Sequence, residues 1–370
     1  MEKKKILIVS KSFYPEISPR SFRTTELVKE FCRLGHDVTL YTLKDNEVQQ
    51  LLVKEFGFKL KGLGKLRFKN LKLNKNNPIE FLIKRIIKRI SLMFLEYPDI
   101  ELMFKVKKVL KQEDGYDLLI SIAVPHPVHW GVAWARKNNH PIAKKWIADC
   151  GDAYMGVIKH DSFGKLFYFK YFEKWFCRKA DYIAIPNINM RVNYYNEFAH
   201  KIVEIPQGFK FEDVANSNKF ENNSVPTFAF TGSFIRTTRN PDRLLKYLSQ
   251  LDIDFKFVIY TNTTELIDHY RSILGNKLVI KNYIPRDELI EEISRMDFLI
   301  NIGYDPAQQA PSKLIDYQLS GRPILNFITN EIDKQMLNEF LSGNYKNAFV
   351  YSDIEKFRIE NVCNNFLGHS

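Results

Sequence analysis

The sequence contains few cysteines and no long apolar run. Its 370 residues include four cysteines, which are widely separated and form no Cys-x-x-Cys pair. This spacing argues against a disulfide framework and a structural zinc site, and it predicts a protein of the reducing cytoplasm. The apolar run near the N-terminus is too short for a signal peptide, and no apolar segment is long enough to cross a bilayer.

Positive charge is abundant and unevenly distributed. The formal net charge is +12, and residues 54–111 alone contain 16 Lys and Arg against 5 Asp and Glu. Within this basic segment, apolar and basic side chains of residues 83–94 fall on opposite faces at helical spacing, which predicts an amphipathic cationic helix. Such a helix is either a core helix with a solvated basic face or a helix that docks on an anionic membrane surface. The segment lacks glycine-rich and stacking motifs, so we do not expect nucleic acid as a partner.

Strand-like apolar runs alternate with helical patterns along most of the chain. The runs occur at residues 5–10, 37–42, 117–122, 145–149, 181–185, 227–231, 255–260, 278–280, 298–302 and 323–327. Continuous apolar runs are typical of strands that are buried on both faces of a parallel sheet. The alternation therefore predicts an α/β protein, and its length suits two domains.

The most informative stretch spans residues 310–325. Pro311 and Ser312 predict the start of a helix, where free N–H groups and the positive end of the dipole suit a phosphate. Lys313 adds a positive charge in the first turn. Asp316 lies about one turn further along, and its carboxylate can accept two hydrogen bonds from a ribose diol. The stretch therefore predicts a nucleotide site, and an ordinary capped surface helix is the alternative.

A second candidate loop occupies residues 232–241. Gly232 ends a predicted strand, and a residue without a side chain lets the backbone approach a ligand. Arg239 carries a planar guanidinium that can bind a phosphate through two hydrogen bonds, and Arg236 is its nearby competitor. A plain surface arginine is the alternative interpretation.

Polar residues also follow the predicted strands of the N-terminal half. Because ligands bind beyond the carboxyl ends of strands in open α/β sheets, we expect these residues to converge on one site. A structural role is the alternative for each histidine, and the spacing of the aspartates is too loose to define a metal site. The residues are Ser18 and Arg23, His126 and His129, and Asp149 and Asp152.

Three stretches carry a resemblance to a known family. Residues 311–323 resemble the Pro-x-Lys-x-x-Glu-Tyr…Gly-[Lys/Arg]-Pro signature of retaining glycosyltransferases of the GT-B fold, family four. Residues 232–241 are similar to that family's Thr-Gly-x-x-x-x-x-Arg-x-Pro loop, and residues 35–38 to its Gly-His-[Glu/Asp]-Val motif. The resemblance covers nearly the whole chain. It implies two Rossmann-like, doubly wound parallel-sheet domains that face a central cleft.

The resemblance also implies the domain limits and the roles of individual residues. An acceptor-binding domain is expected over residues 1–206, a nucleotide-sugar-binding domain over 207–345, and a helix within 346–370 that crosses back to the first domain. Asp316 stands where the family has a ribose-binding Glu, and Gln308 replaces a second Glu eight residues earlier. The expected donor-binding residues are Arg239, Arg236, Lys313, Asp316, Gln308, Gly232 and Ser312. The candidate catalytic residues are Asp152, Asp149, His129 and His126. Ser18 and Arg23 are the candidate acceptor or loop residues: Ser18 stands where the family has its Gly-Gly loop, and Arg23 matches the family's Arg.

These observations predict a glycosyltransferase of the hexosyltransferase type. It would move a sugar from a nucleoside-diphosphate sugar to a hydroxyl of a lipid-linked or surface-polysaccharide acceptor, and retention is implied by the family alone. Fixed cations would stabilise the leaving diphosphate, so neither a metal nor a cofactor is expected. The expected location is the cytoplasm, peripheral on the inner face of the cytoplasmic membrane. The alternatives are a non-catalytic nucleotide-sugar-binding protein, an epimerase of the same fold, and a phosphorylase.

Overall fold

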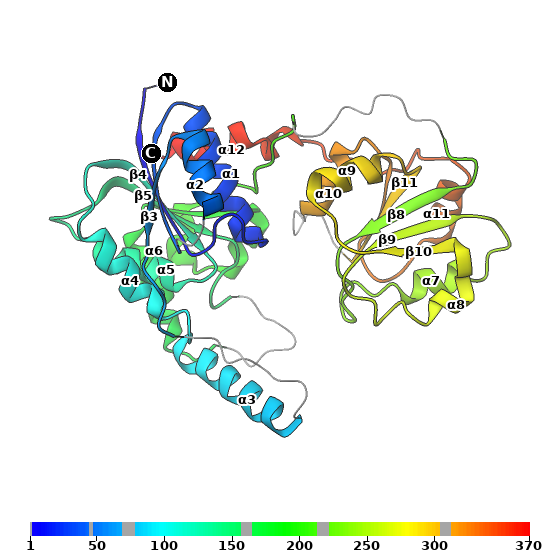
Figure 1. Ribbon diagram of the computed structural model, residues 1–370, viewed down its shortest axis with the longest axis horizontal. Helices are drawn as coiled ribbons and strands as arrows, with labels where there is room; N and C mark the ends of the chain where they lie inside the picture. The colour runs from blue at the N-terminus through cyan, green and yellow to red at the C-terminus, as the bar shows by residue number, and fades with distance from the viewer. Residues whose placement is uncertain (1, 44–46, 69–77, 157–164, 213–221, 304–311) are drawn as a thin grey trace. The chain divides into compact units, whose positions relative to one another are not determined.

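The computed structural model describes residues 2–43, 47–68, 78–156, 165–212, 222–303 and 312–370. The chain forms two compact units. Unit 1 comprises Met1–Phe209 and Ile359–Ser370, and unit 2 comprises Lys210–Arg358. Each unit contains one parallel sheet with helices on both faces (Figure 1).

Unit 1 is built on a seven-stranded sheet in the order β3-β2-β1-β4-β5-β6-β7, and every pair of neighbours is parallel. Its strands are β1 (Lys5–Ser10), β2 (Asp37–Thr42), β3 (Lys59–Gly62), β4 (Tyr116–Ala123), β5 (Ala143–Cys150), β6 (Tyr182–Ile185) and β7 (Ile202–Glu204). Its helices are α1 (Pro19–Arg33), α2 (Glu47–Phe56), α3 (Pro78–Leu95), α4 (Glu101–Leu110), α5 (Pro127–Ala135), α6 (Phe169–Lys179) and α12 (Ile359–Gly368), with two 3-10 helices, η1 (Ile188–Asn193) and η2 (Asn196–Lys201).

Unit 2 repeats the same plan with a five-stranded parallel sheet in the order β10-β9-β8-β11-β12. Its strands are β8 (Thr227–Thr231), β9 (Lys256–Tyr260), β10 (Leu278–Lys281), β11 (Phe298–Ile302) and β12 (Ile324–Phe327). Its helices are α7 (Asp242–Leu248), α8 (Tyr270–Leu274), α9 (Arg286–Ser294), α10 (Ser312–Leu319) and α11 (Lys334–Leu341), with the 3-10 helices η3 (Gly275–Lys277) and η4 (Glu355–Phe357).

Helices cover both faces of each sheet, which explains why the strands read as continuous apolar runs. In unit 1, α1, α2 and α12 pack on one face, and α4, α5 and α6 pack on the other. In unit 2, α7, α8 and α11 share a core with one face, and α9 and α10 with the other. The expected doubly wound α/β class is therefore confirmed.

The last helix belongs to unit 1 although unit 2 precedes it in the sequence. Helix α12 packs on α1, and the rings of Phe366 and Phe31 lie edge to face with their centroids 6.4 Å apart. Val362 and Cys363 are fully buried in the same core. The C-terminal segment thus completes the core of the first unit.

Two edge strands, β3 and β7, escaped sequence analysis. Strand β3 pairs with β2 alone, at the edge of the sheet, and its sequence is Lys-Leu-Lys-Gly. None of its four residues is buried, so it carries no continuous apolar run. An edge strand of this kind gives little periodic signal in a sequence.

Candidate functional site

The strand order of unit 2 reverses between β8 and β11, which is where open α/β sheets bind ligands. Gly232 follows β8 with φ +115°, and its N–H donates to the Tyr260 carbonyl over 2.9 Å. Gly303 follows β11 with φ +73°, and a Cβ added there would lie 1.7 Å from the Thr238 carbonyl oxygen. Two loops therefore meet backbone to backbone at this point, and only glycine permits their contact.

A hydrogen bond connects helix α10 to the end of β8. The Tyr317 hydroxyl accepts a hydrogen bond from the Thr231 backbone N–H over 2.7 Å, and Tyr317 is fully buried. Leu314 and Ile315 are fully buried as well. These contacts place the first turn of α10, which begins at Ser312, at the carboxyl edge of the sheet.

Lys313 and Arg239 are brought together at this edge. The ammonium nitrogen of Lys313 is buried and lies 4.2 Å from the ring centroid of Phe230. Burial lowers the pKa of Lys313 well below its usual range, and the charge of Arg239 lowers it further. Arg239 is half-buried and closes a hairpin through two backbone hydrogen bonds with Ile235, of 2.8 and 3.1 Å. Arg236 is exposed within that hairpin, and no described contact brings it to Lys313.

Asp316 forms an ion pair that the sequence analysis did not anticipate. Arg286, the first residue of α9, donates a hydrogen bond of 2.8 Å from Nε to Oδ1 of Asp316, and its Nη2 lies 2.7 Å from the same oxygen in an ion pair. Burial raises the pKa of Asp316, and the Arg286 guanidinium opposes this effect. A sequence signal for Arg286 existed, because it follows Pro285 just after β10, at the same edge of the sheet. Gln308 and Pro311 lie outside the described residues.

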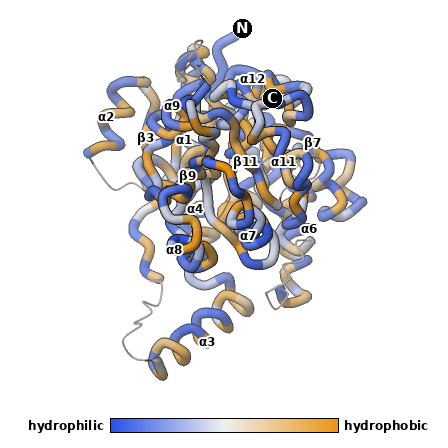
Figure 2. Tube along the Cα trace, turned by 90° about the vertical axis from the view of Figure 1, so that its right-hand side faces the viewer, coloured by the Kyte–Doolittle hydropathy of each residue, from blue (hydrophilic) through white to orange (hydrophobic). Residues whose placement is uncertain are grey.

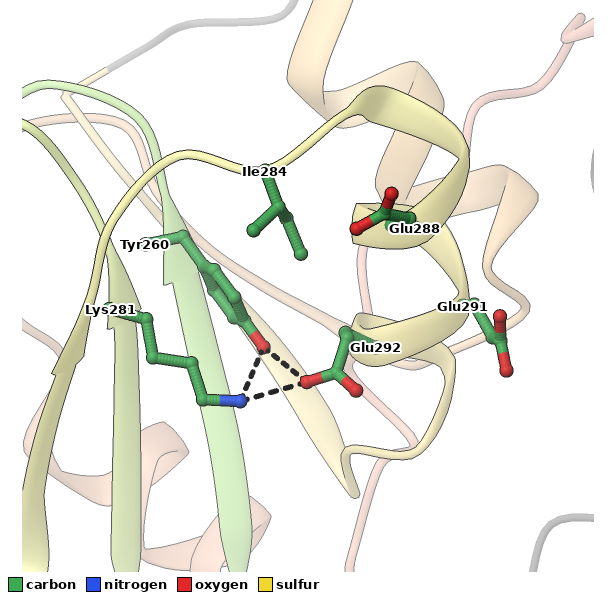
Figure 3. A pocket seen from close by; sticks show the side chains of 6 residues that line it. All are labelled: Tyr260, Lys281, Ile284, Glu288, Glu291 and Glu292. Carbon is green, nitrogen blue, oxygen red and sulfur yellow. Dashed lines mark hydrogen bonds and ion pairs between the residues drawn. The ribbon is translucent and has the colours of Figure 1, made fainter.

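A separate cavity of about 300 Å³ lies between α9 and the strands β9 and β10 (Figure 3). The Glu292 carboxylate accepts hydrogen bonds of 2.8 Å from both the Tyr260 hydroxyl and the Lys281 ammonium. Glu288 and Glu291 add two further carboxylates to the lining. This cavity is acidic and does not suit a diphosphate, but its hydrogen bonds tie α9 to the sheet.

In unit 1, Arg23 and Asp149 form a buried ion pair with two hydrogen bonds. The Arg23 Nε and Nη2 atoms donate to Oδ2 and Oδ1 of Asp149 over 2.8 and 2.9 Å, and each side chain is 3% exposed. Arg23 also donates to the carbonyls of Ile205 (3.1 Å) and Pro206. The pair therefore joins α1, the end of β5 and the segment after β7. This geometry favours a structural role for both residues, and their expected acceptor and catalytic roles stay untested predictions.

The two histidines lie together but differ in their surroundings. His129 is fully buried, with Nδ1 2.7 Å from the Ser121 hydroxyl and Nε2 3.4 Å from the Cys150 sulfur. Burial lowers the pKa of His129 well below its usual range, so the ring is neutral. His126 donates from Nε2 to the Asp152 carbonyl over 3.2 Å, and burial lowers its pKa to about 4. Both histidines thus act as hydrogen-bonding groups of the core at neutral pH.

Asp152 is the exposed member of the predicted unit 1 residues. Next to it, a Cβ added to Gly151 would lie 1.4 Å from Nη2 of Arg20, so this guanidinium packs directly on the backbone. Arg20 was missed by the sequence analysis, although it lies in the first turn of α1. Ser18 caps that helix, because its hydroxyl accepts from the Ser21 N–H over 3.2 Å. The structure therefore gathers Arg20, Asp152 and His126 near the end of β5.

No protein-family model matches the sequence, and no curated protein matches it. Solved structures do match it along their whole length. TarM is 12% identical, with 100% of this chain and 99% of TarM covered and a TM-score of 0.63. The lipopolysaccharide outer core galactosyltransferase WaaB, in its apo form, is 14% identical, with coverages of 99% and 98% and a TM-score of 0.59.

Two further matches concern ligands and chemistry. A Staphylococcus aureus TarM mutant in complex with fondaparinux, alpha-GlcNAc-glycerol and UDP is 12% identical, covers 99% of each chain and has a TM-score of 0.56. A Listeria monocytogenes protein assigned as a UDP-N-acetylglucosamine 2-epimerase is 10% identical, with coverages of 100% and 96% and a TM-score of 0.52. Likeness at this level of identity establishes the fold. The chain has the fold of GT-B glycosyltransferases, which confirms the resemblance noted in its sequence.

Proposed function

We propose that the protein is a glycosyltransferase that takes its sugar from a nucleoside-diphosphate sugar. The observation that carries this proposal is the convergence of Lys313 and Arg239 beside α10, one turn before Asp316, at the switch point of a GT-B sheet. Negative charge develops on the departing diphosphate during transfer. Cations that are fixed in place before the reaction stabilise this charge without rearrangement.

Each member of the site has a distinct task in this mechanism. Lys313 is held in a buried position that disfavours its charged form, so an arriving diphosphate restores the proton and forms a strong ion pair. Arg239 supplies a second, permanent charge. Asp316 accepts hydrogen bonds from the ribose hydroxyls. Transfer of a hexosyl group with retention and without a metal rests on the family resemblance and belongs to the same proposal.

Among the candidate catalytic residues of unit 1, Asp152 is the one that we favour. Its carboxylate is exposed, whereas both oxygens of Asp149 are occupied by Arg23. His126 supports this assignment, because it holds the backbone of Asp152 in place through the 3.2 Å hydrogen bond. We therefore assign the orienting or proton-accepting role to Asp152 and supporting roles to the histidines.

The donor site is tested by nucleotide binding. A thermal-shift and calorimetric screen of UDP-, GDP-, ADP- and dTDP-sugars identifies the base. In Lys313→Ala and Arg239→Ala, loss of a charge-assisted contact of about 1.5–3 kcal/mol should weaken donor binding about 10- to 150-fold and abolish turnover. Lys246→Ala, an exposed lysine of α7, is the matched control. Wild-type donor affinity in both site variants would overturn the proposal.

An epimerase is the second candidate, because the assigned epimerase of Listeria monocytogenes shares the fold. The two activities differ in what they require. An epimerase converts the nucleotide-sugar without an acceptor, whereas a transferase releases the nucleoside diphosphate only as the acceptor is glycosylated. Incubation of the selected donor alone, followed by product analysis, separates them, and a chain that binds donor yet gives neither product is a binding protein.

We further propose that helix α3 brings the enzyme to an anionic membrane surface that carries its lipid-linked acceptor. None of residues 79–95 is buried. Hydrophobic and hydrophilic residues alternate along the helix (Figure 2). One face of the helix is apolar and exposed, with Ile79, Leu82, Ile83, Ile86, Ile87, Ile90 and Phe94. The opposite face carries Lys84, Arg85, Lys88 and Arg89. A membrane interface accommodates both faces at once, with acyl chains beneath the apolar face and anionic headgroups beside the basic one.

No helix in the described part of the chain is long and apolar enough to cross a membrane. We propose a peripheral association, on the inner face of the cytoplasmic membrane. The acceptor that this location supplies is a lipid-linked or surface-polysaccharide precursor. The proposal places unit 1, which contains α3, on the acceptor side of the reaction.

Vesicle flotation tests the membrane proposal. The protein should float with vesicles that contain phosphatidylglycerol and remain behind with pure phosphatidylcholine. The double variant Arg85→Gln, Lys88→Gln removes about 2 kcal/mol of surface attraction and should reduce binding about 30-fold at low salt. Lys137→Gln, Lys144→Gln makes the same change in net charge away from α3 and should bind normally. Equal binding by the two double variants would refute a specific role for the helix.

A further inference from the structure

We propose that Arg286 is a positioning residue that orients Asp316 toward the ribose of the donor. This inference rests on the proposed function and adds to it a residue outside the expected donor-binding motifs. Arg286 would act on the nucleotide through the carboxylate and not through direct contact with the diphosphate. The argument comes from the geometry of the ion pair and from its mounting on α9.

The ion pair leaves one carboxylate oxygen available. Both nitrogens of Arg286 reach Oδ1 of Asp316, at 2.8 and 2.7 Å, and no hydrogen bond from another described residue reaches Oδ2. The pair of Arg23 and Asp149 is different, because there the guanidinium engages both oxygens and each side chain is 3% exposed. The Arg286 and Asp316 side chains are 24% and 15% exposed. In the first pair both carboxylate oxygens accept hydrogen bonds from the arginine, whereas in the second the described contacts of the arginine use Oδ1 alone.

The guanidinium also favours the ionised form of the Asp316 carboxyl, which is the form that accepts hydrogen bonds from both ribose hydroxyls. Burial pushes the carboxyl of Asp316 toward its protonated form, and Arg286 is the cation that opposes this shift. A protonated carboxyl cannot accept hydrogen bonds from both hydroxyls of a diol with equal strength. Asp is also one methylene shorter than Glu and has one rotatable bond fewer. A partner that fixes Oδ1 therefore also fixes the direction in which Oδ2 points.

Arg286 is held on a rigid support. It is the first residue of α9, and this helix is tied to β9 and β10 by the hydrogen bonds of Glu292 with Tyr260 and Lys281 (Figure 3). Ile293 of α9 and Tyr317 of α10 lie in the same hydrophobic cluster. The two helices that carry the pair are therefore fixed to one sheet and to each other, as a positioning role requires.

The experiment compares a ribonucleotide with its 2′,3′-dideoxy analogue. The probes are UDP, GDP or ADP, whichever binds best in the screen above, and the dideoxy form of the same nucleotide. Wild-type protein should prefer the ribonucleotide by about tenfold or more, because hydroxyl hydrogen bonds to a carboxylate are lost in the analogue. Arg286→Ala should lose most of this preference and retain the wild-type affinity for the dideoxy form within about twofold. Arg286→Lys should recover part of it.

Arg295→Ala is the matched control. Arg295 lies at the other end of α9 and pairs with Glu291 and Glu292 on the surface, so its variant should keep the wild-type preference. A second readout is the pH profile of binding. The acidic limit of ribonucleotide affinity should move to higher pH in Arg286→Ala, because the carboxyl loses the cation that favours its ionised form.

The outcomes separate this inference from the proposed function. An equal loss of affinity for both nucleotides in Arg286→Ala would assign the arginine to general structure or to the diphosphate, and the inference would be wrong. A preserved preference for the ribonucleotide would also overturn it. If wild-type protein itself fails to distinguish the two nucleotides, the role of Asp316 in the proposed function is wrong, and the inference falls with it.

Discussion

The structure predicts a large loss of stability when Arg23 is truncated to alanine. The substitution removes both hydrogen bonds to Asp149 and the two to the carbonyls of Ile205 and Pro206. It leaves the Asp149 carboxylate, 3% exposed, without its cation. Breaking a buried ion pair in this way costs about 3–5 kcal/mol, because the remaining charge stays in a poorly solvating environment.

A double-mutant cycle separates the charge from the packing. Arg23→Met with Asp149→Leu removes both charges and keeps most of the volume, so it should recover much of the stability lost in Arg23→Ala. Arg33→Ala on the same helix is the control. Arg33 pairs with Glu30 near the surface and is 34% exposed, so its loss should cost less than about 1 kcal/mol.

Tryptophan fluorescence reports on the relevant unit alone. All four tryptophans, Trp130, Trp134, Trp146 and Trp175, belong to unit 1. Urea unfolding followed at this signal therefore measures the stability of unit 1. With a urea dependence of about 1–3 kcal/mol per molar, the Arg23→Ala midpoint should fall by about 1 M or more. If Arg23→Ala lowers the free energy of unfolding by less than about 1 kcal/mol and abolishes turnover, the structural assignment is wrong. Arg23 and Asp149 would then have a catalytic role.

Two further predictions concern unit 2. Nucleotide affinity should fall as the pH rises above the lowered pKa of Lys313, because the diphosphate binds the ammonium form. It should also fall as the pH drops through the raised pKa of Asp316. Calorimetry in buffers of different ionisation enthalpy should detect proton uptake on binding at pH values above the pKa of Lys313. Gly303→Ala should destabilise unit 2 by more than the ~1–2 kcal/mol that a left-handed φ costs, because its Cβ also meets the Thr238 carbonyl. Gly321→Ala, with φ +71° and no atom within 4 Å, isolates the backbone cost, so equal calorimetric losses in the two variants would contradict the proposed loop contact.

Much of the fold could be predicted because its signals are local. Strands buried on both faces, such as Lys5–Ser10 and Phe298–Ile302, are continuous apolar runs, and this pattern can be recognised from the sequence alone. Edge strand β3 was missed because its half-solvated Lys-Leu-Lys-Gly sequence has no such pattern. In the donor region, Lys313 and Asp316 could be placed on one helix because their separation along the chain sets their spacing in space.

The partners of the site residues could not be predicted in the same way. Arg23 meets Asp149 across 126 residues of sequence, and Arg286 meets Asp316 across 30. Sequence analysis assigned Asp149 a catalytic role and overlooked Arg286. Neither pairing has a local signature, because an ion pair between two elements depends on how their strands are ordered in the sheet.

The amino-acid sequence by itself determined the class of fold, the helix that presents Lys313 and Asp316, and the amphipathic character of α3. These features depend on residue type and periodicity over one or two elements. Only the tertiary structure decided which carboxylate is closed off by an arginine and which keeps an oxygen for a ligand. That distinction arises from burial and from contacts between distant segments. The free energy of a charged group depends on these surroundings and not on its position in the sequence.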